Sequence, residues 1–411
     1  MKVRVSLKNL NVSRFDEILL YYGLQQKEIK IIEGELEIPE RGFVLITGIS
    51  GSGKSFILRE IAKQLNVEVL KFDESRYNSN VLLKDYVRDL KLLSQAGFSD
   101  VPVLFTEVKH LSDGQKYRLF LLKNILSKDV LIIDEFCNQL DEFYTISIMK
   151  MVKRFAKNKL IITATSRPFG LDYFTPDKVY KCECSSIKKE EVKQRNILDD
   201  IKILPASISD WQYFSRYHYR NSTPGIFNKA LKAVFRNHMV GIVVAGQPYL
   251  NISVRNKLFP KYKNNGKLVN KEIFMIHRIV VSPEMRNLGV SRLLIKEIEK
   301  VYKGKKMVEL VTSLNDIIPF AEKAGFKFGG VLPPNPIRKR CQKLGFDFNR
   351  YLDDRYVKEF VLEHFDELKS AVVDSYRRGL KMKRHDLDVD RVAYDVQRMC
   401  NIVTKYYYKM L

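Results

Sequence analysis

A glycine-rich segment early in the chain has the composition and spacing of a phosphate-binding loop. Residues 48–55 read Gly-Ile-Ser-Gly-Ser-Gly-Lys-Ser and fit the pattern G-x-x-x-x-G-K-S/T. An apolar run at 43–47 precedes the segment, and a helical pattern at 56–65 follows it. Glycines let backbone N–H groups curl around a phosphate, and the N-terminus of the next helix adds partial positive charge. We therefore expect this segment to bind a nucleotide.

The residues expected to hold Mg-ATP come from this loop and from a second segment. Lys54 is expected to reach the β- and γ-phosphates, and the Ser55 hydroxyl is expected to bind Mg²⁺. An apolar run at 130–133 ends in Asp134 and Glu135. A carboxylate at a strand tip can hold Mg²⁺, which we expect of Asp134, and Glu135 beside it can orient or deprotonate the attacking water as a catalytic residue. The expected nucleotide contacts of the loop are Gly48, Ser50, Gly51, Ser52, Gly53, Lys54 and Ser55.

Two further segments of this half carry a family resemblance. Leu111-Ser112-Asp113-Gly114-Gln115 closely resembles the LSGGQ signature of the ABC ATPases, and Asn138-Gln139-Leu140-Asp141 resembles their D-loop. The resemblance implies an ABC-type nucleotide-binding domain over residues 1–185. It also implies a homodimer through this domain, in which Ser112 and Gly114 of one protomer meet the ATP held by the other.

The chain departs from that family at two places. Ser166 occupies the position of the family's switch histidine, which argues against fast, histidine-assisted hydrolysis. The interval between Lys54 and Ser112 is short, so the subdomain that docks on membrane helices is reduced. The reduced subdomain and the lack of a membrane segment favour a nucleic-acid-associated or regulatory ATPase over the energy subunit of a transporter, which stays a third alternative.

A second turn, in the other half of the chain, also suits a diphosphate. An apolar run at 276–281 leads to the turn at 286–291 and then to a helical pattern. The turn resembles motif A of the GNAT acyltransferases, R/Q-x-x-G-x-G/A, and residues 319–326 resemble a later segment of that family. The resemblance implies that N–H groups of the turn hold the diphosphate of acetyl-CoA. The expected contacts are Val280, Val281, Arg286, Asn287, Leu288, Gly289, Val290 and Ser291.

Three residues are candidates for the base that deprotonates the attacking amine. His277 lies in the strand before the turn, and Glu309 lies in the next expected strand. His218 stands among tyrosines and arginines, a combination that also suits stacking on a nucleic-acid base. A core histidine, a solvated strand residue and an amphipathic helix face are the respective alternatives. Ala321 stands where many members of the family have a tyrosine acid.

The charge of the chain points to phosphate-bearing partners. It has 71 Lys and Arg against 48 Asp and Glu, and residues 191–411 hold 41 basic and 23 acidic groups. Such a field attracts nucleic acid, nucleotides or an anionic membrane face, or keeps a protein soluble. We expect nucleic acid, RNA or DNA. Asn251, Arg255 and Asn256 could read base edges, although an ordinary loop fits equally well.

The alternation of apolar runs and helical patterns predicts an α/β protein of two modules. The expected boundaries are an ATPase domain at 1–185, a linker at 186–210, an acyltransferase domain at 211–335 and a basic helical extension at 336–411. No apolar stretch reaches the about 18 residues that a membrane helix needs, so no membrane association is expected. Five scattered cysteines indicate a reducing, cytoplasmic location. Residues 182–184, Cys-Glu-Cys, supply too few ligands for a metal site.

Taken together, the chain resembles a family of ABC ATPases fused to an acetyltransferase domain. The cofactors that this implies are ATP, Mg²⁺ and acetyl-CoA. We expect direct transfer of an acyl group to an amine, with a nucleic-acid base as acceptor. The alternative is a nucleic-acid clamp or maintenance ATPase whose acetyltransferase fold has lost catalysis.

Overall fold

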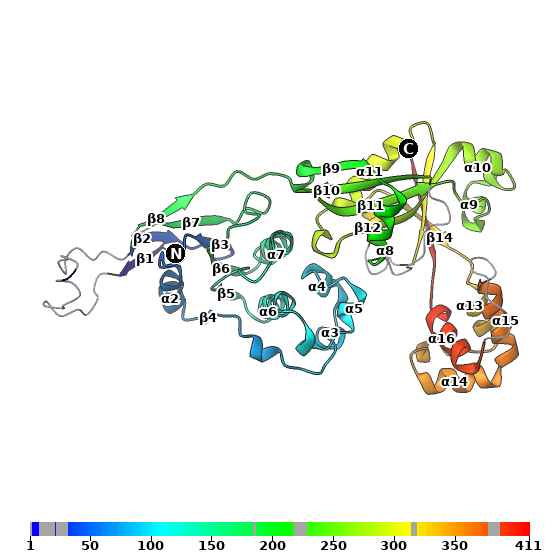
Figure 1. The fold of residues 1–411 in the computed structure, drawn as a ribbon, viewed down its shortest axis with the longest axis horizontal. Helices are drawn as coiled ribbons and strands as arrows, with labels where there is room; N and C mark the ends of the chain where they lie inside the picture. Colours follow the sequence, from blue (N-terminus) through cyan, green and yellow to red (C-terminus); the bar gives the residue numbers. More distant parts are fainter. Residues whose placement is uncertain are drawn as a thin grey trace.

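The computed structural model describes residues 2–7, 21, 32–183, 186–217, 228–313, 319–376 and 387–411. They form two neighbouring α/β domains and a separate helical lobe (Figure 1). Each domain is built on its own sheet, one with eight strands and one with seven in this part of the chain. The predicted α/β class is therefore confirmed. None of the helices among these residues combines the length and apolar character that crossing a bilayer requires.

The first sheet has a parallel centre that helices cover on both faces. Its order is β1-β2-β8-β7-β3-β6-β5-β4. Strand β3 is buried along its whole length: Phe43 and Leu45 lie in the core with α6 and α7, whereas Val44 and Ile46 pack against α2. Burial on both faces explains why the strand is a continuous apolar run. The elements are β1 (Lys2–Leu7), β2 (Ile32–Glu37), β3 (Gly42–Thr47), α2 (Lys54–Leu65), β4 (Val69–Leu70), α6 (Asp113–Ser127), β5 (Val130–Ile133), α7 (Glu142–Phe155), β6 (Leu160–Thr165), β7 (Lys178–Glu183) and β8 (Ser186–Glu190).

A small helical segment links β4 to α6. Its residues Leu83, Leu93 and Phe98 are buried in the same core as α6, so the segment packs onto the domain rather than extending from it. It ends at Ser112, the N-cap of α6. Its elements are η2 (Glu74–Tyr77), α3 (Leu83–Tyr86), α4 (Leu90–Gln95), α5 (Val101–Leu104) and η3 (Val108–His110).

The second sheet has the order β14-β15-β13-β12-β11-β10-β9 and contains one parallel pair, β12 with β13. This pair runs only from Ile273 opposite Met307 to Ile276 opposite Leu310, so the two strands separate at His277. Helix α11 covers one face and α8 the other. The elements up to the separated strands are η4 (Ile197–Asp200), β9 (Ile201–Pro205), α8 (Ile208–Ser215), β10 (Lys229–Phe235), β11 (His238–Gly246), α9 (Ser253–Leu258), η5 (Pro260–Tyr262), α10 (Gly266–Glu272) and β12 (Ile273–Val281). Those that follow are η6 (Pro283–Met285), α11 (Val290–Val301), β13 (Met307–Thr312), α12 (Phe320–Lys323) and β14 (Lys327–Val331).

The last part of the chain is helical except at its end. Four helices form a lobe with its own apolar core: α13 (Pro336–Lys343), α14 (Asp354–Glu363), α15 (Phe365–Tyr376) and α16 (Val389–Cys400), with η7 (Phe348–Arg350) between the first two. Strand β15 (Lys405–Met410) then returns to the second sheet between β13 and β14. The expectation that residues 336–411 are helical throughout is wrong at this strand. Its three consecutive tyrosines have high strand propensity, and the gap between β13 and β14 supplies the partners.

Two of the expected boundaries also differ from the structure. Residues 186–190, expected in a linker, form β8 of the first sheet, where they pair antiparallel with β7. Residues 201–205, expected in the same linker, form β9 at the edge of the second sheet. The charged composition of both segments hid them, because most side chains of these two strands are at least partly exposed. Strand β9 lies at the edge of its sheet, and β8 pairs with β2 only at Glu33 and Ser186.

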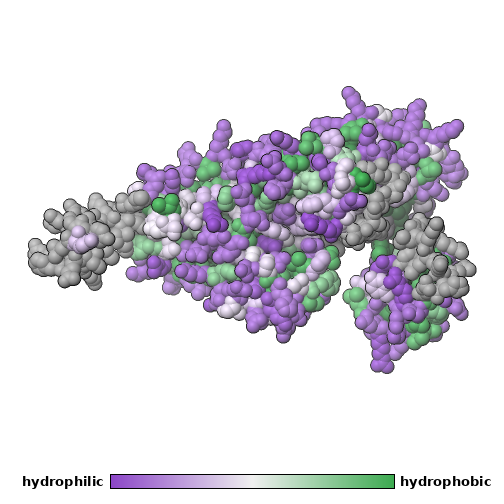
Figure 2. Space-filling view, in the orientation of Figure 1, coloured by the Kyte–Doolittle hydropathy of each residue, from purple (hydrophilic) through white to green (hydrophobic). Residues whose placement is uncertain are grey.

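The two domains share an apolar seam. Ile146 of α7 and Tyr173 lie in the same buried cluster as Phe235 and Ile197 of the second domain. Phe143 contacts Phe235 edge to face, with ring centroids 5.7 Å apart. Hydrophilic residues dominate the surface of both domains on the face shown in Figure 2. The seam is therefore an apolar contact between two domains that are mainly hydrophilic on the face shown.

Candidate functional site

The phosphate-binding loop connects β3 to α2. Gly51 and Gly53 have φ of +80° and +88°, and a Cβ at Gly48 would lie 2.6 Å from the Cys182 carbonyl oxygen. No side chain caps α2 at Gly53, so the N–H groups of its first turn are available to an anion. The glycines are therefore required by the backbone itself, as the motif predicts.

Lys54 lies within the curl of this loop. Its Nζ donates to the carbonyl oxygens of Gly48 and Ile49 at 2.8 and 2.6 Å. Partial burial lowers the pKa of Lys54, while Cys182 and Asp134 oppose the shift. The Asp134 carboxylate, directly after β5, therefore interacts with the charge of the loop lysine, as expected of residues that would share a Mg²⁺ and phosphate site.

The two acidic residues after β5 differ in their surroundings. Asp134 is buried, and its Oδ1 accepts a hydrogen bond from the Glu135 N–H at 3.0 Å. Glu135 is exposed and has a φ of +54°, a left-handed conformation that a glutamate seldom adopts. No group of three or more His, Cys, Asp or Glu side chains that could hold a metal occurs in the described ranges. Mg²⁺ at Asp134 and Ser55 would therefore draw its other ligands from phosphate and water.

The signature-like segment caps the long helix α6. The Ser112 side chain and Gln115 form a capping box, in which Ser112 N–H donates to Gln115 Oε1 at 2.9 Å. Ser112 and Asp113 are exposed at this helix end. At the end of β6, Ser166 is also exposed, at the position where the resemblance to the ABC ATPases implies a switch histidine.

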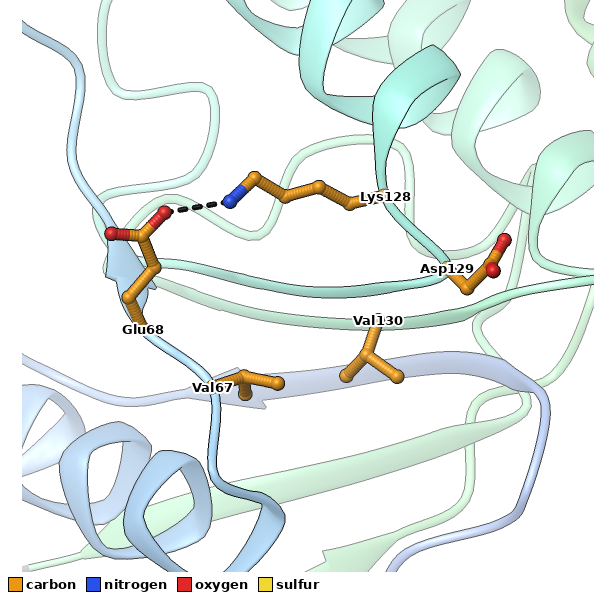
Figure 3. A pocket seen from close by; sticks show the side chains of 5 residues that line it. All are labelled: Val67, Glu68, Lys128, Asp129 and Val130. Atoms are coloured by element: carbon orange, nitrogen blue, oxygen red, sulfur yellow. Dashed lines mark hydrogen bonds and ion pairs between the residues drawn. The ribbon is translucent and has the colours of Figure 1, made fainter.

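A surface pocket is lined by none of the residues expected to bind phosphate. It is lined by Val67, Glu68, Lys128, Asp129 and Val130, and the Lys128–Glu68 ion pair of 2.6 Å spans it (Figure 3). These residues lie at the amino ends of β4 and β5, whereas the phosphate loop follows the carboxyl end of β3. Ligands of open parallel sheets bind beyond the carboxyl ends of the strands, so we assign this pocket no role.

The second diphosphate-type loop connects β12 to α11 through η6. Gly289 has a φ of +96°, and no side chain caps α11 at this residue. A Cβ at Gly289 would lie 3.3 Å from Leu198 Cδ1. The N–H groups at the start of a 12-residue helix are thus free, as diphosphate binding requires.

Two polar side chains of this loop bind the first domain. The Arg286 guanidinium donates to the carbonyl oxygens of Val281, at 2.9 Å, and of Ser99. Asn287 Nδ2 donates to the Ser94 carbonyl oxygen at 3.1 Å, and Lys150 Nζ donates to the Asn287 carbonyl oxygen. Burial lowers the pKa of Arg286. Nothing in the sequence pattern indicated these contacts, because the partners are far apart along the chain.

Basic side chains of both domains gather beside this loop. Burial lowers the pKa of Lys150, and the neighbouring charges of Arg292, Lys323 and Arg154 lower it further. Arg292 and Lys323 belong to the second domain, whereas Arg154 lies on α7 of the first. A group of cations next to free N–H groups is suited to a phosphate-bearing ligand.

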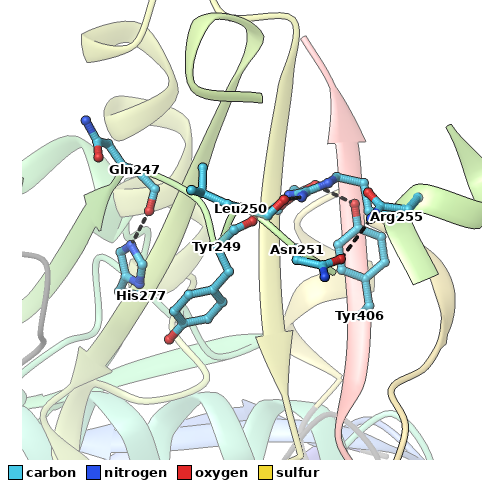
Figure 4. Close-up of polar contacts among 9 residues, drawn as sticks. Gln247, Tyr249, Leu250, Asn251, Arg255, His277 and Tyr406 are labelled. Carbon is cyan, nitrogen blue, oxygen red and sulfur yellow. Dashed lines mark hydrogen bonds and ion pairs between the residues drawn. The ribbon is translucent and has the colours of Figure 1, made fainter. Parts of the chain in front are cut away.

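His277 is the first residue of β12 beyond the segment that pairs with β13. Its Nε2 lies 2.9 Å from the Gln247 carbonyl oxygen, and Tyr249 contacts its ring edge to face (Figure 4). Because a carbonyl oxygen only accepts, Nε2 carries the proton and Nδ1 keeps its lone pair. Burial lowers the pKa of His277, so the ring is neutral at physiological pH.

Glu309 does not have the setting of a catalytic base. It is fully buried, its Oε2 lies 3.1 Å from Arg255 Nη1, and its Oε1 accepts from the Tyr406 hydroxyl at 2.7 Å. Burial raises the pKa of Glu309, and Arg255 and Tyr406 oppose the rise. With its oxygens engaged, Glu309 holds Arg255 instead of reaching a substrate.

Arg255 in turn fixes the loop beside His277. It donates to the carbonyl oxygens of Tyr249 and Leu250, at 2.9 and 2.5 Å (Figure 4). Its complete burial favours the structural alternative for Arg255 over the reading of base edges. Asn251 is exposed, with its Oδ1 bonded to Asn256.

The other residues singled out from the sequence are a histidine, two cysteines and an alanine. His218 and Cys184 lie outside the described residues. Cys182 is buried, with its thiol 2.7 Å from the Ser52 carbonyl oxygen, which makes it a packing residue behind the phosphate loop. Ala321 is fully buried and carries no proton donor where the related acyltransferases have tyrosine.

Two protein-family models match this chain, one in each domain. A model described as "AAA domain" matches residues 38–163, and one described as "Acetyltransferase (GNAT) family" matches residues 198–326. The ADP conformation of MJ1267, an ATP-binding cassette of an ABC transporter, is 15% identical, with 41% of this chain and 88% of that chain covered and a TM-score of 0.31. A Bacillus anthracis protein described as a streptothricin acetyltransferase, in complex with acetyl coenzyme A, is 16% identical, with 47% and 68% covered and a TM-score of 0.23.

Proposed function

Because this chain joins an AAA-type P-loop ATPase domain to a domain of the GNAT acetyltransferase family, we propose that it transfers the acetyl group of acetyl-CoA to an amine carried on nucleic acid. The observation that carries the proposal is the position of His277. This neutral histidine lies where β12 and β13 separate, on the strand that leads directly to the diphosphate-type loop. The ATPase domain binds Mg-ATP and closes as a homodimer through its signature segments.

The residues of the second domain divide the acetyl transfer among them. The N–H groups at Gly289 and the start of α11 hold the diphosphate of acetyl-CoA, which supplies the acetyl group as a thioester. His277 Nδ1 takes a proton from the acceptor amine while the amine nitrogen attacks the thioester carbonyl. The new C–N bond forms, the C–S bond breaks, and the departing thiolate takes up a proton. Gln247 keeps the histidine in the required tautomer.

The charge and aromatic residues of the second half support a nucleic-acid acceptor. Residues 191–411 hold 41 basic and 23 acidic groups. Arg216 lies 4.4 Å from the Tyr213 ring centroid and 4.7 Å from that of Tyr217, a cation–aromatic group of the kind that stacks on bases. We expect labelled acetyl-CoA to modify a nucleoside of tRNA or DNA. Labelling of small amines with no label on either polymer would refute this acceptor.

A non-catalytic nucleic-acid clamp is the second candidate. It is favoured by Ser166 in place of the switch histidine and by the buried Ala321 in place of the tyrosine acid. Calorimetric titration separates the two functions, since a clamp has no need to bind acetyl-CoA. Saturable acetyl-CoA binding followed by acetyl transfer supports the enzyme, whereas nucleic-acid binding without either supports the clamp.

A further inference from the structure

Several polar contacts between the domains involve the loop proposed to hold the acetyl-CoA diphosphate. Arg286 binds the Ser99 carbonyl oxygen, and Asn287 binds that of Ser94. Both acceptors lie within the short stretch 94–99, the end of α4 and the turn that follows it. The first domain therefore holds two polar side chains of the loop.

The same stretch contacts the signature-like segment through Arg118. This arginine lies on α6 and is almost fully buried. Its Nη1 donates to the Ala96 carbonyl oxygen at 3.2 Å, and its Nε donates to the Gly114 carbonyl oxygen at 3.3 Å. The guanidinium thus bridges the segment expected to meet ATP and the turn that holds the acetyl-CoA loop.

The surroundings of Arg118 fit closely around its guanidinium. The guanidinium lies 4.6 Å from the Phe98 ring centroid and 3.9 Å from that of Tyr144. Gly97 has a φ of +81°, and a Cβ at this position would lie 2.5 Å from Arg118 Nη1. Because closely packed groups move together, a shift of the signature segment is transmitted to residues 94–99.

We propose that nucleotide engagement at Ser112 and Gly114 controls the affinity for acetyl-CoA, through Arg118 and the turn at 94–99. In the docked arrangement the Arg286 guanidinium and the Asn287 amide are committed to carbonyl oxygens of the first domain and of β12. Displacement of 94–99 releases them to the diphosphate. Nucleotide at the signature therefore raises acetyl-CoA affinity. This inference rests on the proposed function, because it assumes that the loop binds acetyl-CoA.

The test is calorimetric titration of acetyl-CoA into the full chain, with and without a saturating non-hydrolysable ATP analogue and Mg²⁺. We expect the analogue to lower the Kd by about 5- to 100-fold, the range of ordinary coupling energies. Linkage requires acetyl-CoA to tighten analogue binding by the same factor. Lys54→Ala lacks the lysine expected to bind phosphate. In this variant the Kd of acetyl-CoA should be the same with and without the analogue.

Arg118→Lys tests the route of the coupling, because it keeps the charge but removes the planar group that binds two carbonyl oxygens. We expect the effect of the analogue on acetyl-CoA affinity to disappear. Arg88→Lys is the control, an exposed arginine of the helical segment that precedes α6, and should keep the full effect. If Arg118→Lys folds poorly, amide hydrogen exchange in the wild-type chain gives a second readout. We expect exchange at residues 286–293 to become faster when the analogue binds.

Each outcome bears on the proposal. An acetyl-CoA Kd that the analogue leaves unchanged, or a full effect in Arg118→Lys, overturns the coupling while the acetyltransferase function stands. Absence of acetyl-CoA binding with and without the analogue overturns both. Tightening in wild type and Arg88→Lys, together with its loss in Arg118→Lys, supports the coupling.

Discussion

Two residues, Gly53 and Gly289, place the N-terminus of a long helix where an anion can reach it. Each is the N-cap of its helix, with φ of +88° and +96°, and neither helix has a side-chain cap. A residue with a Cβ resists this conformation, and a capping side chain would occupy the N–H groups. The same backbone device therefore occurs once in each domain, before α2 and before α11.

Gly289→Ala tests the second of these sites. The added Cβ meets Leu198 and strains the left-handed backbone, so we expect acetyl-CoA to bind at least about tenfold more weakly, while ATP binding is retained. Gly304→Ala is the matched control: this glycine has a φ of +101°, and a Cβ added to it would meet no neighbouring atom within 4 Å. Titration calorimetry measures both variants. Equal loss of affinity in the two would show that strain, and not the loop, is responsible.

His277→Gln tests the proposed base. We expect kcat to fall by about 10²- to 10⁴-fold, with little change in KM for acetyl-CoA. The base is active when neutral, and burial lowers its pKa below 6.5. The wild-type rate should therefore fall as the pH drops through that lowered pKa and stay level just above it. A pH–rate profile with the same acidic limb in wild type and variant would assign the limb to another group.

At the scale of elements, strand β15 begins a series of polar contacts that ends at Tyr249, next to His277. Tyr406 on β15 donates to Glu309 on β13, Glu309 holds Arg255 of α9, and Arg255 holds the carbonyl oxygens of 249–250. Tyr249 contacts the His277 ring. This chain of contacts crosses the sheet and depends on the insertion of β15 between β13 and β14.

Substitutions in this buried group should reduce stability. Glu309→Gln leaves the Arg255 guanidinium buried without its counter-charge, which costs about 3–5 kcal/mol in comparable pairs. Tyr406→Phe removes one hydrogen bond and should cost about 1–2 kcal/mol. Denaturant unfolding measures both. If Glu309→Gln cost no more than Tyr406→Phe, the charge of Glu309 would add nothing to stability beyond what a hydrogen bond supplies.

At the scale of the whole molecule, the two domains differ in charge but share one seam. Residues 1–190 hold 30 basic and 25 acidic groups, whereas the second half holds 41 and 23. The apolar contacts of Ile146 and Phe143 with the second domain join the ATPase to this strongly basic half. Nucleic acid bound to the basic half, as proposed above, would be joined through this seam to the ATPase domain.

Binding of nucleic acid should depend steeply on salt. If six to ten phosphates are contacted, affinity should fall by about 10³- to 10⁵-fold between 50 and 200 mM salt. Fluorescence anisotropy with labelled tRNA and with duplex DNA measures the slope for each polymer. An affinity that stays constant over this range would indicate that the basic residues serve solubility and not phosphate binding.

The sequence by itself predicted the features that depend on neighbouring residues, namely the two loops and the helices near the end of the chain. Each phosphate-type loop is a short run between a strand and a helix, so residues 48–55 and 286–291 predicted both sites and both domain types. The helical character of the last part was also evident as far as Cys400. Such features depend on local backbone conformation, which neighbouring residues specify.

Only the tertiary structure decided which polar residues are buried and what they contact. The Arg255–Glu309 pair joins residues 54 positions apart, Tyr406 reaches Glu309 across 97, and Arg286 reaches Ser99 across 187. A carboxylate or guanidinium in an apolar strand or loop has the same local pattern whether it faces solvent, a ligand or an opposite charge. Its role is settled by the packing of distant segments, because burial and long-range pairing exist only once the sheets are assembled.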